Sequence, residues 1–60
     1  MDPLATWRQI GDPDDPDERP FHALNLLRWL ALSGYVPEGI PSLTTVVDRC
    51  ETIIIRALEQ

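Results

Sequence analysis

Lysine is absent from this sequence, and cysteine and histidine occur once each. A disulfide cannot form within the chain, because Cys50 is its one cysteine. His22 and Cys50 together are too few ligands for a Cys/His metal site. In a chain of this size the core rarely supplies more than about 3–5 kcal/mol, and a disulfide, a metal or self-association commonly adds to it. We therefore expect self-association or docking on a larger partner, and no cofactor.

Positive charge is also scarce, since ten acidic residues outnumber five basic ones and give a net charge of −5. The basic residues are spread along the chain, at Arg8, Arg19, Arg28, Arg49 and Arg56. Without a basic run, the sequence favours neither binding to nucleic-acid phosphates nor attachment to anionic lipid. A helix-turn-helix DNA reader is disfavoured for the same reason. We expect a protein partner, no nucleic acid bound directly through its phosphates, and no membrane.

Long apolar runs are missing as well. The longest apolar-rich stretch, 21–32, contains His22, Asn25 and Arg28 and is too short to cross a bilayer. The N-terminus has no basic segment ahead of an apolar run, as a signal peptide would have. We expect an intracellular protein, cytoplasmic or, if it comes from a eukaryotic virus, nuclear.

The strongest pattern that the sequence does contain is an amphipathic helix over residues 42–59, with Ser42 as its expected N-cap. With 100° of rotation per residue, most of its apolar side chains fall within an arc of about 140°. They are Leu43, Val46, Val47, Cys50, Ile53, Ile54, Ala57 and Leu58. Ile55 lies outside this arc among charged residues, where it is either a stray exposed residue or part of a second interface.

A second helix is predicted over residues 18–33. Asp17 can serve as its N-cap, Pro20 suits its first turn, and Gly34 suits the left-handed position beyond its end. Its apolar side chains occupy more than one face, which is typical of a helix that is buried on several sides. The glycines and prolines of residues 34–41 predict a turn, so the two long helices should form an antiparallel hairpin.

A hairpin of two helices can hide only one stripe from each. We expect Leu24, Leu27 and Ala31 to face the last helix, which leaves three large side chains in water, namely Phe21, Trp29 and Leu32. Fully burying each of these three is worth roughly 1.5–3 kcal/mol. Their total is comparable to the whole stability of a small domain, so the N-terminal helix, with Trp7, and a second copy are together expected to cover them.

The first twenty residues predict a short helix and a linker. Asp2 can cap a helix over residues 3–10, and Gly11 can follow its end. Residues 11–20 contain three prolines and five acids, which favour an extended, solvated conformation. This linker does not predict a calcium site, because Pro16 occupies the third ligand position that a calcium loop would need.

Together these patterns predict an all-α protein with a single small domain, 1–60. The hairpin of 18–33 and 42–59, with the helix over 3–10 packed outside, is expected to assemble into a dimeric helical bundle. The candidate interface residues, for self-association or another protein, are Trp7, Phe21, Leu24, Leu27, Trp29, Leu32, Val47, Cys50, Ile54, Ile55 and Leu58.

The sequence shows no constellation of catalytic groups, and we expect no enzyme. His22 is the one histidine, and no nucleophile lies at a defined spacing from it. Cys50 lies within the apolar stripe, where a thiol is typically a small, inert core residue. In a symmetric dimer the Cys50 side chains of the two copies could instead meet near the axis.

These observations favour a non-enzymatic protein–protein interaction module. It would be a small regulator, inhibitor or adaptor that acts through an apolar helical surface, as in viral, phage or plasmid accessory proteins. Two alternatives remain open. The acids from Asp12 to Glu18 could mimic phosphates and occupy a nucleic-acid-binding protein, or the chain could be an oligomerisation domain from a longer protein.

Overall fold

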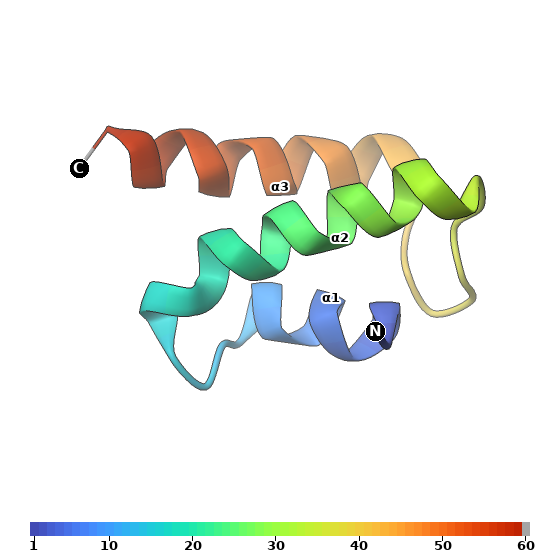
Figure 1. Ribbon diagram of the computed structural model, residues 1–60, viewed down its shortest axis with the longest axis horizontal. Coiled ribbons are helices and arrows are strands. Elements are labelled where there is room, and N and C mark those ends of the chain that lie inside the picture. The colour runs from blue at the N-terminus through green and yellow to red at the C-terminus, as the bar shows by residue number, and fades with distance from the viewer. Residues whose placement is uncertain (60) are drawn as a thin grey trace.

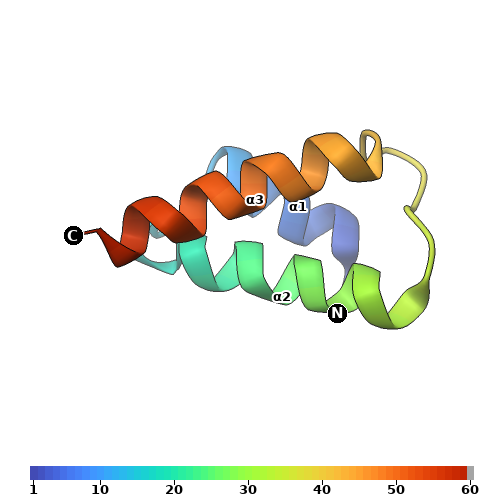
Figure 2. The same cartoon turned by 90° about the horizontal axis from the view of Figure 1, so that it is seen from above.

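The structure is a computed structural model that describes residues 1–59, and these residues form helices and turns without any strand. The elements are α1 (Pro3–Gly11), a short 3₁₀ helix η1 (Pro16–Glu18), α2 (Arg19–Ser33) and α3 (Leu43–Leu58). The predicted all-α class is confirmed. In Figure 1, α2 and α3 run in opposite directions, and α1 lies on the other side of α2 from α3. Seen from above, α2 lies to one side of both, so the three helices form a triangle in cross-section (Figure 2).

Short-range hydrogen bonds place three of the helix ends. The Asp2 carboxylate accepts from the backbone N–H of Leu4 at 3.1 Å and of Ala5 at 3.3 Å, which caps α1. Ser42 Oγ accepts from the N–H of Thr45 at 3.4 Å and caps α3. Gly34 ends α2 with φ of 76°, a left-handed conformation that glycine adopts without a steric penalty. The predictions for these three positions are confirmed.

The N-cap predicted for α2 is wrong. Glu18 takes that position and its side chain makes no capping bond, because η1 already precedes the helix. Asp15 caps η1 instead, accepting from the backbone N–H of Asp17 at 3.0 Å. Gly11 likewise is the last residue of α1, where it was expected just beyond the end.

The segment between α1 and α2 is folded, which corrects the prediction of an extended linker. Besides η1, a pair of hydrogen bonds ties its first half to α1. The N–H of Asp14 donates to Gln9 Oε1 at 2.9 Å, and Gln9 Nε2 donates to Asp14 Oδ2 at 3.0 Å. Local hydrogen bonds to aspartate therefore outweigh the repulsion among the acids.

The core lies where the three helices meet. Its buried apolar residues are Ile10, Ala23, Leu26, Leu30, Ile40, Val46 and Cys50. On α2 the buried residues are Ala23, Leu26 and Leu30. Of the three residues predicted to face α3, Leu27 packs against the core and Leu24 lies opposite α3 in a groove, but Leu24 and Ala31 are exposed. Because α1 and α3 both pack against α2, the buried side of α2 faces the space between these two helices. The side of α2 that faces α3 alone is less buried.

The turn between α2 and α3 contributes to the core and covers the start of α1. Ile40 is buried, and Gly39 lies so close to Leu4 that an added Cβ would stand 3.3 Å from Leu4 Cδ1. At the beginning of the turn, the rings of Trp29 and Tyr35 meet edge to face with centroids 5.4 Å apart. Trp29 is consequently half-buried, and it is less exposed than a hairpin of two helices would leave it.

Candidate interaction site

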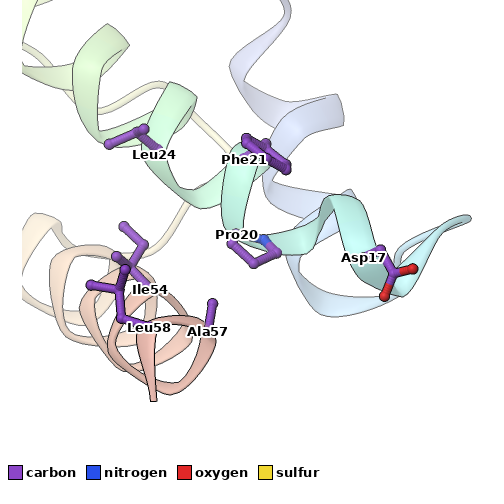
Figure 3. A pocket seen from close by; sticks show the side chains of 7 residues that line it. All are labelled: Asp17, Pro20, Phe21, Leu24, Ile54, Ala57 and Leu58. Atoms are coloured by element: carbon purple, nitrogen blue, oxygen red, sulfur yellow. The ribbon is translucent and has the colours of Figure 1, made fainter. Parts of the chain in front are cut away.

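An apolar groove runs between the start of α2 and the end of α3. Its volume is about 370 Å³, and it is lined by Asp17, Pro20, Phe21, Leu24, Ile54, Ala57 and Leu58. We call it the α2–α3 groove. Figure 3 shows that Pro20, Phe21 and Leu24 come from the first two turns of α2, opposite Ile54, Ala57 and Leu58 near the end of α3. Asp17 is the one titratable residue among its walls.

The walls of this groove remain accessible to solvent. Phe21 is 60% exposed, Leu24 57% and Leu58 80%, although side chains of these types are usually buried. They are exposed because α2 turns its buried stripe toward α1 and α3 together. The apolar residues on the outer side of α2 are then only partly covered by α3.

The apolar surface continues beyond the groove along both helices. Leu32 lies on the same side of α2 as Phe21, eleven residues or about three helical turns away, and is 78% exposed. Leu43 lies on the same side of α3 as Ile54, again eleven residues away, and is 51% exposed. Apolar residues clustered in this way along two neighbouring helices differ from single apolar residues scattered over a surface.

The structure divides the predicted interface residues into several groups. Phe21, Leu24, Ile54 and Leu58 line the α2–α3 groove, and Leu32 is exposed farther along α2. The half-buried candidates are Trp7, Leu27, Trp29 and Val47. Ile55 is 53% exposed, as expected for its isolated position, and it is not among the residues that line the groove.

Cys50 is the one candidate that the structure removes from the surface. Its side chain is fully buried within a single chain, so it cannot meet a second copy. The reason is the position of α2, which covers the centre of the apolar stripe of α3. Burial raises the pKa of the Cys50 thiol, and the positive charge of Arg49 opposes this shift in part. The thiol is therefore protonated and unreactive at neutral pH.

Two further properties of residues 1–59 bear on function. No three histidine, cysteine, aspartate or glutamate side chains in this part of the chain come close enough together to hold a metal ion. None of its helices combines the length and the apolar character needed to cross a membrane.

A second groove is not predicted by the sequence, in which the arginines are spread along the chain. Its volume is about 410 Å³, and Arg19, Arg49 and Arg56 all line it. We call it the arginine groove; its other lining residues are Ile10, Thr45, Asp48, Thr52 and Ile53. Arg49 and Arg56 are seven residues apart, two turns on one helix face, which is a signal that the sequence does contain. Arg19 joins them only because α2 begins next to the end of α3.

Comparison of this chain with models of known protein families, with curated proteins and with solved structures finds no significant match, so the two grooves are the observations from which a function can be argued.

Proposed function

We propose that this protein is a non-enzymatic protein–protein interaction module, a small regulator or adaptor that self-associates through the α2–α3 groove. In this proposal α2 and α3 act as a helical hairpin, and two hairpins pack face to face as a dimeric four-helix bundle. The observation that carries the proposal is the exposure of Phe21, Leu24 and Leu58 around one groove. Its apolar walls suit packing against another apolar surface more than chemistry on a bound substrate.

The free energy available from covering the groove is substantial for so small a chain. Fully burying a leucine or phenylalanine side chain is worth about 1.5–3 kcal/mol. Phe21, Leu24 and Leu58 are each more than half exposed, so more than half of this free energy remains available on association. Two copies that cover each other would together gain several kcal/mol. Leu32 and Leu43 extend the surface that a partner would cover.

Charge on the same surface favours a second copy of this chain as the partner. Leu24 of α2 lies opposite Ile54 of α3 across the groove. The two helices run in opposite directions and have the same rise per residue. One turn farther along, Arg28 on α2 is therefore level with Glu51 on α3, and both are exposed. A two-fold axis parallel to the helices would lay each α2 antiparallel on the α3 of the other copy. Arg28 would then face Glu51 of the second copy, with apolar residues on both sides of the pair.

Sedimentation equilibrium across the micromolar range tests this proposal. The wild-type protein is expected to be a dimer, and Leu58→Asp a folded monomer, because a carboxylate in the groove would have to be desolvated on association. Thr52→Asp is the matched control, since it adds a carboxylate at an exposed position on the other side of α3. It is expected to dimerise as the wild type does, and circular dichroism checks that both variants remain helical.

A wild-type protein that is a folded monomer throughout this range would reject self-association. Loss of the dimer in Thr52→Asp but not in Leu58→Asp would show that the other side of α3 forms the interface.

A further inference from the structure

Three of the five arginines meet at the arginine groove, although the chain as a whole is acidic. Arg19 begins α2, and Arg49 and Arg56 lie two turns apart on α3. Arg19 and Arg56 also line an adjoining hollow of about 210 Å³ together with Pro16, Pro20, Ile53 and Ala57. Arg28 lies elsewhere, on the outer side of α2.

One donor in this groove lacks an acceptor. The Nε of Arg19 is buried and has no hydrogen-bond partner among the described residues. Buried donors in folded proteins nearly always have a partner, so one without an acceptor needs an explanation. Less than 1 Å² of this atom is accessible, so an anionic ligand would supply the missing acceptor only after a shift of the Arg19 side chain.

The charge balance at the groove favours an anion. Asp48 is the one acidic residue among its walls, against three arginines. Arg49 is also held in place, because its guanidinium carbon lies 5.7 Å from the centroid of the Trp7 ring in a cation–π contact. A guanidinium that is already positioned loses less conformational freedom when it binds a ligand.

We propose that the arginine groove binds a single phosphate group, free or carried as a monoester. Arginine pairs with phosphate through two parallel hydrogen bonds, and a phosphate monoester offers three strong acceptor oxygens and a charge of about −1.5 to −2 at pH 7. Three guanidinium groups match those oxygens better than they match the two oxygens of a carboxylate. A long polyanion does not fit, because the net charge is −5 and the acids from Asp12 to Glu18 directly precede Arg19.

Titrations followed by ¹H–¹⁵N NMR at constant ionic strength test the proposal. The probes are inorganic phosphate, O-phosphoserine and, as a carboxylate comparator, succinate. Backbone amides near Arg19, Arg49 and Arg56 are expected to shift on addition of either phosphate probe, and succinate is expected to bind at least tenfold more weakly. Equal affinity for the two phosphate probes would identify the phosphate as the recognised group, and tighter binding of O-phosphoserine would identify a monoester as the ligand.

Arginine variants separate recognition from general charge effects. Arg19→Gln and Arg56→Gln are expected to weaken phosphate binding at least tenfold, whereas Arg8→Gln, which removes the same charge on α1 outside the groove, leaves it unchanged. An absence of shifts at millimolar phosphate would overturn the proposal. So would equal weakening in Arg8→Gln, or succinate binding as tightly as phosphate.

The proposal is independent of self-association, because the two grooves lie on different sides of α3. Leu58→Asp, expected to be a monomer, should bind phosphate with unchanged affinity. Phosphate binding that is lost with the dimer would overturn a site formed within one chain.

Discussion

Truncation of Ile10 tests whether α1 is part of the core. Ile10 is 1% exposed and is the most buried apolar residue that α1 contributes, whereas Trp7 of the same helix is half-buried. If the three helices share one core, Ile10→Ala should destabilise α2 and α3 as well as α1. An α1 that rests loosely on a self-sufficient pair of helices would leave the other two unaffected.

The expected loss is large relative to the stability of the chain. Replacing a buried isoleucine with alanine costs about 2–5 kcal/mol, because buried methyl groups are lost and a cavity remains. A stability of about 0.05–0.15 kcal/mol per residue gives roughly 3–9 kcal/mol for a chain of this length. Ile10→Ala should therefore remove about a fifth of the stability or more, and Ile10→Val, which deletes one methylene, about 0.5–1.5 kcal/mol.

Urea unfolding followed by far-ultraviolet circular dichroism measures the effect. A urea dependence near 1 kcal/mol per molar converts the loss in Ile10→Ala into a midpoint shift of about 2 M or more. Ile55→Ala is the control, since truncation of this exposed side chain should change stability by no more than about 0.5 kcal/mol. All variants must be compared at one protein concentration, because self-association would add to stability. A shift for Ile10→Ala no larger than that for Ile55→Ala would refute a core shared by the three helices.

Two further predictions concern the end of α2 and the buried thiol. Gly34→Ala should cost about 1–2 kcal/mol in thermal unfolding, because φ at this position is 76° and a Cβ is strained there. Burial raises the pKa of Cys50 above its ordinary 9.0, so the folded state holds the thiol proton more tightly than the unfolded state. Stability should therefore fall as pH rises past the ordinary value, by up to about 1.4 kcal/mol per pH unit. Cys50→Ala should be less stable at pH 7 but should lack this thiol-dependent fall in stability. Urea unfolding between pH 7 and 10.5 measures both effects. An equal fall in stability at alkaline pH in the two proteins would contradict a raised thiol pKa as its cause.

The two proposed sites differ in how far the sequence could reveal them. Four residues of the α2–α3 groove are predicted as interface candidates, because the chain has more large apolar side chains than two helices can cover; they are Phe21, Leu24, Ile54 and Leu58. The arginine groove was not predicted, although Arg49 and Arg56 share a helix face. Arg19 is thirty residues away from Arg49, and its approach depends on the packing of two helices.

Residue patterns within a few positions were sufficient for the helices themselves. Asp2, Ser42 and Gly34 act on backbone groups no more than four residues away, so their roles follow from the residue type and its immediate neighbours. The isolated position of Ile55 likewise follows from the period of a single helix. The N-cap prediction near η1 is wrong because two aspartates within one turn can each act as a cap. Asp17 is the predicted cap, and Asp15 is the one that caps η1.

The tertiary structure decided which side of each helix is buried. Ala23, Leu26 and Leu30 form the buried stripe of α2 because α1 and α3 approach this helix from different directions. Cys50 became a core residue, and Leu24 a surface residue, through the same arrangement. A helix with apolar residues on several sides does not specify its own orientation, because burial depends on partners that lie far away along the chain.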